Sequence, residues 1–173
     1  MIGIINTARG VLFAILIALC LPLLWQFATG GSTLTVTGTS MHPTYERGDV
    51  LFVDKVTTPP QDFWQKGNIV VVVFDPTQPE ENRYVHRVDQ VLDGGKAILK
   101  GDGNPEQDVS PVALNQVYGT PTLAIQGPWA HIYQFTQSLL GRIIIFGTGI
   151  ITLIILDHHA RRTRRTRQNQ TTT

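Results

Sequence analysis

Two long apolar runs constrain this 173-residue sequence more than any other feature. The first is VLFAILIALCLPLLWQF, residues 11–27, and the second is SLLGRIIIFGTGIITLIIL, residues 138–156. A helix rises about 1.5 Å per residue, so about 20 apolar residues cross a hydrocarbon core of about 30 Å. The stretch between the runs has ordinary polar composition and a length of roughly 100 residues, which suits one modest domain. We therefore expect a membrane anchor over 1–30, a domain over 31–136, a transmembrane helix over 137–157 and a basic tail over 158–173.

The charges that follow the second run predict a topology. Five arginines lie between Arg161 and Arg167, directly after the run, and such clusters mark the cytoplasmic side of a transmembrane helix. Two crossings return the N-terminal segment, with Arg9, to the same side. The expected location is therefore the cell membrane, with two helices, both termini cytoplasmic and the middle domain outside the cytoplasm.

Other interpretations of the apolar runs stay open at the level of sequence. A basic residue, an apolar run and small residues such as Ala28 and Gly30 also describe a cleaved export signal. The length of the first run and Trp25, a residue type common at membrane interfaces, favour an anchor instead. Pro22 predicts a kink in this helix. For the second run the alternative is a buried core helix, although Arg142 near its outer end can reach the headgroups of a bilayer.

Composition argues against several classes of protein. The net charge is +1 and the basic cluster lies outside the middle domain, so we expect no nucleic-acid partner. Nucleic-acid binding by the arginine tail is the less favoured alternative, because topology already accounts for it. The single cysteine, Cys20, cannot form an intramolecular disulfide, and no spacing of Cys and His indicates a metal site. We expect no cofactor and no metal.

The middle segment has the periodicity of strands. TLTVTG alternates, DVLFV and NIVVVVF are β-branched runs, and YVHRVDQVL alternates without a break. Its odd-numbered residues 85–91 are expected on one face and its even-numbered residues 86–90 on the other. Turn signals rich in Gly, Pro, Asp and Asn separate these runs. The sequence therefore predicts a mainly β domain flanked by N-terminal and C-terminal transmembrane helices.

Three polar stretches of this domain carry residue types used in catalysis. Ser40 lies in the turn GTSMHPT, His86 in the strand YVHRV, and Asp102 and Asp108 in KGDGNPEQD. Each alone is weak evidence, because serine and aspartate are common turn residues and a strand histidine is usually structural. Together, a serine, a histidine base and an orienting carboxylate are the parts of a nucleophilic hydrolase, whose recognition depends on geometry and not on chain order.

The motifs around these residues resemble those of the type I signal peptidases, in particular the archaeal and endoplasmic-reticulum branch. SMHPT at 40–44, followed by GDV at 48–50, resembles the nucleophile box of that family, and YVHRV is similar to the stretch that carries its histidine base. LKGDGNPEQD resembles the Lys-Gly-Asp-x-Asn box with a second aspartate six residues on. The resemblance covers 38–108. The family commonly has Ser-Gly-Ser at the nucleophile, whereas this chain has Gly-Thr-Ser, so one side-chain donor to the oxyanion hole is absent.

The resemblance implies a membrane-bound serine endopeptidase that removes N-terminal signal peptides from exported pre-proteins. Ser40 would attack the peptide carbonyl, His86 would accept its proton, and Asp108 would orient His86. Asp102 either shares that role or holds its loop. The N–H of Ser40, helped by the Thr39 hydroxyl, would stabilise the developing negative charge. The candidate site residues are Ser40, His86, Asp108 and Asp102 for catalysis and Met41 and Thr39 for substrate binding.

Several alternatives accompany this interpretation. Lys100 could serve as a desolvated general base, and His42 is expected to be exposed or to face substrate. Met41 and Pro43 either form an apolar surface that dips into the membrane or pack in the core. A membrane-anchored β-domain that only binds partners would tolerate Ser40→Ala, and a specialised processing peptidase would act on a few secreted substrates. The expected partners are signal peptides of exported pre-proteins and the lipid bilayer, with the secretion translocon as a further candidate.

Overall fold

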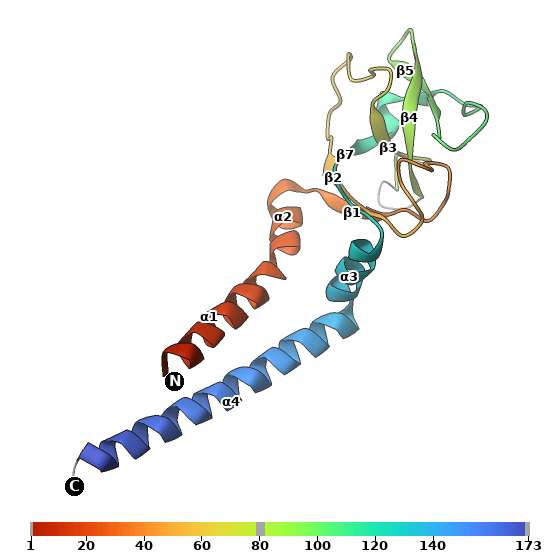
Figure 1. Cartoon of the computed structure of the whole chain (residues 1–173). Helices are drawn as coiled ribbons and strands as arrows, with labels where there is room; N and C mark the ends of the chain where they lie inside the picture. The colour runs from red at the N-terminus through yellow and green to blue at the C-terminus, as the bar shows by residue number, and fades with distance from the viewer. Residues whose placement is uncertain (1, 79–81, 172–173) are drawn as a thin grey trace. The chain divides into compact units, whose positions relative to one another are not determined.

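The computed structural model describes residues 2–78 and 82–171, and the chain divides into two compact units. One unit comprises Met1–Leu24 with Gln134–Thr173, and the other comprises Trp25–Tyr133. The helices are α1 Ile2–Ala18, α2 Leu21–Thr29, α3 Pro128–Gln137 and α4 Leu139–Thr171, with a 3-10 turn over Leu114–Gln116. The strands are β1 Ser32–Thr35, β2 Val50–Lys55, β3 Ile69–Val73, β4 Arg83–Leu92, β5 Lys96–Lys100, β6 Val112–Ala113 and β7 Val117–Ile125 (Figure 1).

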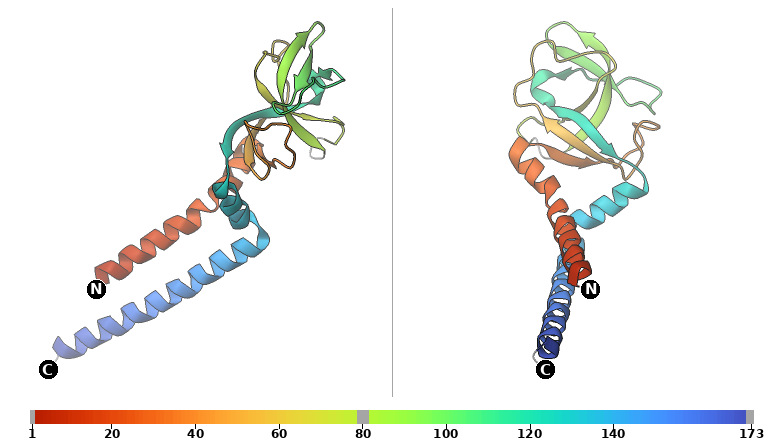
Figure 2. Two further views of the ribbon diagram at one scale, coloured as in Figure 1. Left: turned by 45° about the vertical axis from the view of Figure 1, so that its right-hand side comes forward. Right: turned by 60° about the vertical axis from the view of Figure 1, so that its left-hand side comes forward.

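The strands of the second unit form one seven-stranded antiparallel sheet. Its order is β1-β2-β7-β3-β4-β5-β6, so the last strand, β7, is inserted between β2 and β3. The sheet curls into a half-barrel, as the two views of Figure 2 show. The mainly β fold with apolar helical segments at both ends, expected from the sequence, is confirmed.

Strand β3 is buried on both faces of the sheet. Val71 and Val73 belong to one hydrophobic core, and Val70 and Val72 belong to a second. Successive side chains of a strand point to opposite faces, so a β-branched run without polar positions is typical of a strand covered on both sides. Val70 pairs with His86 of β4, and the histidine therefore stands beside this buried strand.

Strand β4 departs from the unbroken alternation expected for it. Val88 pairs with Leu99 of β5, whereas Gln90 pairs with Ile98, which leaves Asp89 as an extra residue. Such a β-bulge interrupts the ladder and turns the side chains that follow it. The expected alternation is therefore wrong at Asp89, because register in this sheet is set by pairing with β5 and not by the pattern of β4 alone.

The first apolar run forms two helices in place of one. Helix α1 ends at Ala18 and α2 begins at Leu21, with a turn between them. Pro22 has no amide hydrogen to donate to the carbonyl of Ala18, four residues back, and its ring crowds that carbonyl. The kink predicted from Pro22 is confirmed.

Helices α1 and α4 pack against each other. A Cβ atom added to Gly149 of α4 would lie 3.3 Å from the Leu16 side chain of α1, so the glycine allows a close approach. Two helical segments, Gly3–Thr29 and Leu139–His159, are long and apolar enough to cross a membrane. Helix α4 continues through the arginine cluster to Thr171, where the sequence indicated only a basic tail.

Candidate active site

Ser40 lies in a loop whose two ends are held together by backbone hydrogen bonds. The N–H of Gly48 donates to the carbonyl of Val36, and the N–H of Val36 donates to the carbonyl of Asp49, both at 2.8 Å. Ser40 itself is half-buried. Within the described residues neither the hydroxyl nor the N–H of Ser40 makes a hydrogen bond, so both are available to a bound molecule.

A buried carboxyl group, that of Asp49, sets the shape of the serine loop. Asp49 is 1% exposed. Its Oδ2 accepts a hydrogen bond from the N–H of Glu46 at 2.8 Å, and its Oδ1 accepts one from the N–H of Gly127 at 3.0 Å. Buried polar groups need such partners, and removing them is costly. Asp49 therefore ties the serine loop to the segment that leads from β7 to α3.

Met41, which was expected to contact substrate, packs inward. Its side chain is 1% exposed and belongs to the core that also contains Leu51, Val71 and Tyr118. Burial of a side chain of this size contributes about 1.5–3 kcal/mol, so Met41 anchors the loop. The alternative in which it forms an exposed apolar surface is wrong, because the core takes it up. Thr39, the other candidate for substrate binding, is exposed.

His86 and Asp108 pair beside the serine loop. His86 Nδ1 lies 2.8 Å from Asp108 Oδ2, and the two side chains are 11% and 21% exposed. The N–H of Asp108 donates to the carbonyl of Leu99 at 2.8 Å, which fastens its loop to β5. With Nδ1 engaged, Nε2 is the ring nitrogen left for proton transfer.

An aromatic side chain supports the imidazole from the same face of β4. The Tyr84 ring meets the His86 ring edge to face, with centroids 5.2 Å apart. Burial, with a smaller contribution from the Asp108 carboxylate, raises the pKa of Tyr84 to about 12. The phenol therefore stays neutral across the physiological range.

Two glycines bring the serine loop and the aspartate-bearing loop into direct contact. The point where a Cβ atom of Gly101 would sit is 2.5 Å from the Ser40 carbonyl oxygen and 3.0 Å from His86 Nε2. The N–H of Gly103 donates to the same Ser40 carbonyl at 2.8 Å. His86 Nε2 and the Ser40 carbonyl oxygen therefore both lie within about 3 Å of the Gly101 Cβ position, which brings the imidazole close to the serine main chain. The described residues include no hydrogen bond between Ser40 Oγ and His86, and in enzymes without substrate such bonds are often long.

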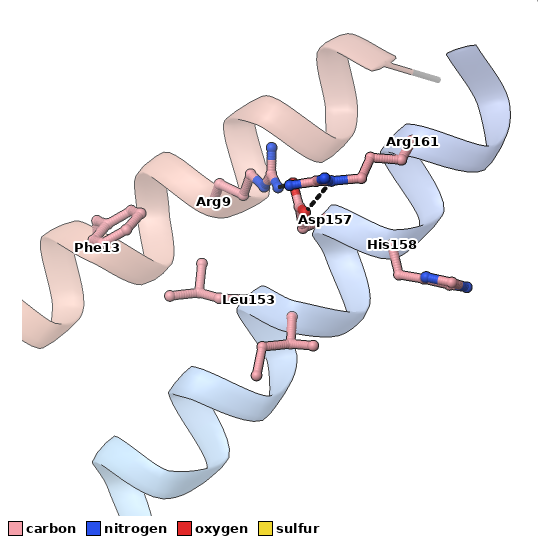
Figure 3. A pocket seen from close by; sticks show the side chains of 7 residues that line it. Arg9, Phe13, Leu153, Asp157, His158 and Arg161 are labelled. Carbon is pink, nitrogen blue, oxygen red and sulfur yellow. Dashed lines mark hydrogen bonds and ion pairs between the residues drawn. The ribbon is translucent and has the colours of Figure 1, made fainter. Parts of the chain in front are cut away.

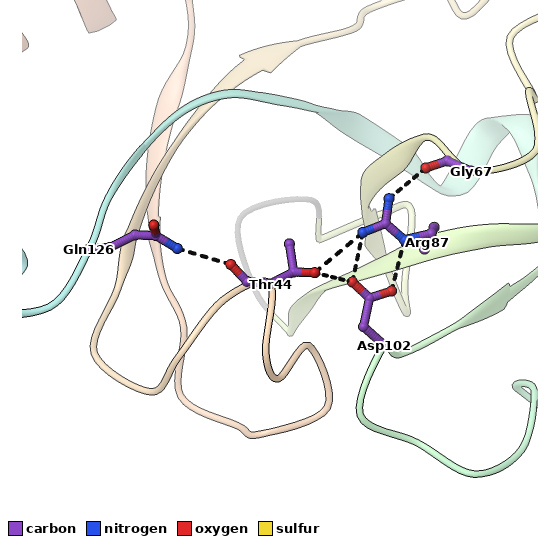
Figure 4. A network of polar contacts seen from close by, with 5 residues as sticks. All are labelled: Thr44, Gly67, Arg87, Asp102 and Gln126. Atoms are coloured by element: carbon purple, nitrogen blue, oxygen red, sulfur yellow. Dashed lines mark hydrogen bonds and ion pairs between the residues drawn. The ribbon is translucent and has the colours of Figure 1, made fainter.

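Asp102 belongs to a separate polar network (Figure 4). Its two oxygens accept hydrogen bonds from Nε and Nη2 of Arg87 at 2.8 and 2.7 Å, a bidentate pair. Thr44 Oγ1 donates to the same carboxylate at 2.5 Å, and Arg87 Nη1 donates to the carbonyl of Gly67 at 2.7 Å. Gln126 Nε2 donates to the Thr44 carbonyl at 2.9 Å. The network therefore joins the serine loop to β4 and to the loop after β5.

The charges of this network are mutually stabilised. Hydrogen bonds from Arg87, with a further one from Thr44, hold the pKa of Asp102 below its ordinary value. The hydrogen bonds to Asp102 in turn raise the pKa of Arg87. Asp102 therefore pairs with Arg87, while Asp108 is the carboxylate that contacts the imidazole.

Two further basic residues, Lys100 and His42, lie close to the candidate catalytic residues in the sequence. Lys100 lines a pocket of about 450 Å³ together with Thr44 and Asp102, and neither Ser40 nor His86 is among its described lining residues. His42 is exposed, with its Nδ1 2.6 Å from Glu46 Oε1. The exposed position expected for His42 is confirmed.

A second pocket, of about 550 Å³, opens beside His86 and Asp108. Its other lining residues are Phe74, Tyr84, Gln107, Val109 and Ser110. Two of its apolar side chains are exposed, Phe74 at 69% and Val109 at 98%. Apolar walls beside polar groups are typical of sites that bind organic ligands or peptide side chains.

The structure thus gathers the Ser40 main chain, His86 and Asp108, and places Asp102 with Arg87. The sequence analysis did not predict the structural roles of Asp49, which shapes the serine loop, and of Arg87, which binds Asp102. A signal existed for each: an acidic residue directly before a buried β-branched run, and an arginine next to the candidate base. In the described part of the chain, no group of three or more His, Cys, Asp and Glu side chains could hold a metal ion.

The domain has a fold of the serine-peptidase type. Residues 23–127, more than half of the chain, match the family described as Peptidase S24-like. The chain belongs to that family, which includes serine peptidases similar to signal peptidase I. A comparison with curated proteins found no match. The resemblance seen in the motifs is therefore confirmed at the level of this wider family.

Proposed function

We propose that the chain is a membrane-bound serine endopeptidase that removes N-terminal signal peptides from exported pre-proteins, as in the archaeal and endoplasmic-reticulum branch of the signal peptidases. The observation that carries the proposal is the His86–Asp108 pair beside the Ser40 main chain, in a Peptidase S24-like domain. Two helical segments apolar enough to cross a bilayer flank that domain in the sequence. Such anchors would keep the site near the membrane, where signal peptides emerge.

In the first half of the proposed reaction, Ser40 Oγ attacks the carbonyl carbon of the scissile peptide bond. His86 Nε2 takes the hydroxyl proton, and Asp108 accepts the hydrogen bond from Nδ1–H and stabilises the imidazolium that forms. The Ser40 N–H, which has no partner within the described residues, donates to the developing oxyanion. The tetrahedral intermediate then collapses as His86 passes its proton to the leaving amine of the mature protein.

The second half releases the signal peptide. The signal peptide is now joined to Ser40 Oγ as an ester, and a water molecule gives its proton to His86 Nε2 and attacks the ester carbonyl. Collapse of this second intermediate frees the new carboxyl end and returns the proton from His86 to Ser40. Asp102 takes no proton in this scheme, because its oxygens serve Arg87 and Thr44.

The proposed topology places both termini in the cytoplasm and the peptidase domain outside it. It is supported by the ion pair between Arg9, in the first half of α1, and Asp157, which precedes the arginine cluster of α4. A second contact, between Leu16 of α1 and Gly149 of α4, shows that the two helices run antiparallel, because the residue numbers rise in one helix as they fall in the other. Both ends of the chain therefore lie at one end of the helix pair. The arginine cluster at that end favours the cytoplasmic side.

The test of this function uses the full chain in detergent with a panel of purified pre-proteins. The new N-termini are read by mass spectrometry. We expect one cut in each pre-protein, after a small residue at the end of the signal peptide, and none in mature proteins from which the signal peptide is absent. Cuts scattered through the mature proteins would contradict a signal-peptide function and indicate a general peptidase. No cut in any pre-protein would favour the binding-domain alternative.

A further inference from the structure

A second site candidate lies in the helical unit, apart from the peptidase chemistry. A pocket of about 580 Å³ opens between α1 and α4, at the end of the helix pair that holds the Arg9–Asp157 contact (Figure 3). Its lining residues are Arg9, Phe13, Leu153, Ile154, Asp157, His158 and Arg161. The pocket is therefore basic at one end and apolar at the other.

The basic end has more positive charge than its carboxylate can neutralise. Asp157 Oδ1 contacts Arg9 Nη2, and Asp157 Oδ2 accepts a hydrogen bond from Arg161 Nε at 2.6 Å. Two guanidinium groups share one carboxylate, which leaves one net positive charge. Each guanidinium has five N–H donors, and the Arg161 side chain is 77% exposed, so donors remain for a second anion.

The other end of the pocket is lined by exposed apolar side chains. Phe13 is 54% exposed and Ile154 is 62% exposed, and both face the pocket with Leu153. They belong to the two helical segments that are apolar enough to cross a membrane. A ligand that fills this pocket must therefore carry a negative charge next to hydrocarbon.

We propose that this pocket binds an anionic glycerophospholipid, with the phosphate at Arg9 and Arg161 and the start of an acyl chain against Phe13, Leu153 and Ile154. Basic pockets between membrane helices on the cytoplasmic side are known to accept such headgroups. Inorganic phosphate offers the same charge but leaves the apolar wall uncovered. The inference rests on the membrane spans and not on the peptidase reaction, and its test measures lipid binding without any cleavage assay.

The experiment is native mass spectrometry of the full chain released from detergent, titrated with phosphatidylglycerol or with phosphatidylcholine. We expect one phosphatidylglycerol to be retained in preference to phosphatidylcholine. Arg161→Gln should weaken that retention about fivefold, the effect of one basic side chain at an anionic lipid surface. Arg142→Gln is the matched control, since it removes the same charge at the other end of α4, and it should leave retention unchanged. Equal retention of the two lipids, or no effect of Arg161→Gln, would overturn the proposal.

Asp157→Asn separates lipid binding from simple helix pairing. The change removes the carboxylate that competes for the two arginines, so phosphatidylglycerol should bind about fivefold more tightly. If Arg9, Asp157 and Arg161 served only to join α1 and α4, Asp157→Asn would weaken phosphatidylglycerol retention or leave it unchanged, and the proposal would fail. Competition with inorganic phosphate identifies the source of the anion. Displacement of phosphatidylglycerol by millimolar inorganic phosphate would contradict a lipid site, and continued retention supports it.

Discussion

His86 Nδ1 and Asp108 Oδ2 lie 2.8 Å apart, whereas Asp102 gives both of its oxygens to Arg87. The two carboxylates that follow the same Lys-Gly motif thus have different hydrogen-bond partners. One contacts the imidazole, and the other joins the serine loop to β4 through Thr44. This difference leads to distinct expectations for the two aspartates.

Asp108→Asn should lower the turnover of pre-protein cleavage by about 10³-fold or more, because an amide no longer selects the imidazole tautomer or stabilises the imidazolium. Folding should change little, since Asp108 is part of no wider network of side chains among the described residues. Steady-state kinetics and circular dichroism measure both properties. Asp62→Asn, which removes a charge at an exposed position, is the control and should be silent. Full activity in Asp108→Asn with loss only in Asp102→Asn would reverse the assignment.

Asp102→Asn should instead lower the free energy of unfolding by about 1–2 kcal/mol at neutral pH, through loss of partly exposed charge-assisted hydrogen bonds to Arg87. The pKa of Asp102 is depressed in the folded protein, so its contribution is present above the ordinary aspartate value near 4 and disappears as the pH falls below it. Denaturant unfolding at pH 7 and at pH 3 measures this. The gap between parent and variant should narrow at pH 3, and a gap of the same size at both pH values would refute the ionic role.

Gly101→Ala should impair both folding and cleavage, because the added Cβ would meet the Ser40 carbonyl at 2.5 Å and His86 Nε2 at 3.0 Å. Main-chain atoms cannot move aside as a flexible side chain can, so the two loops must separate. Gly38→Ala is a matched control next to the serine, since its nearest neighbour, the Ser40 N atom, is 3.9 Å away. Thermal unfolding and pre-protein cleavage compare the two. Equal behaviour of both variants would show that the close contact is unimportant.

Local patterns predicted the elements of the fold well, because strands and membrane helices depend on periodicity and apolar length. The run NIVVVVF became β3, buried on both faces, and Pro22 marked the helix break. The bulge at Asp89 could not be predicted, since it depends on how β4 pairs with β5. The sequence pattern of β4 alone does not reveal that pairing. Met41 was ambiguous for the same reason: an apolar residue in a turn can face outward or inward, and only tertiary packing decides.

The candidate site was predictable as a set of residue types but not as a set of contacts. A serine, a histidine and two aspartates were evident from their motifs, yet the sequence left both aspartates open as partners of His86. The answer depends on how the loop after β5 folds, with the Asp108 N–H on the Leu99 carbonyl and Gly103 on Ser40. Such long-range hydrogen bonds have no local signature.

The topology leads to a labelling prediction. In a Cys20→Ala background, a cysteine at Gln78, exposed in the connection between β3 and β4, should react with a membrane-impermeant thiol reagent in intact cells. A cysteine at Gln168 in the C-terminal part of α4 should react only after the membrane is permeabilised, because the arginine cluster keeps that end inside. The reverse pattern would show that the orientation is inverted.

The most direct test of the central claim is the rate of pre-protein cleavage by His86→Ala, measured beside Ser40→Ala and Lys100→Ala in membrane-inserted protein. If His86 is the base that takes the Ser40 proton, cleavage should fall to background level in His86→Ala and Ser40→Ala. Cleavage should remain measurable in Lys100→Ala, since neither Ser40 nor His86 is among the described lining residues of the pocket that Lys100 lines. Retained cleavage in a folded His86→Ala variant, with loss in Lys100→Ala, would contradict the serine–histidine mechanism and assign the base to lysine.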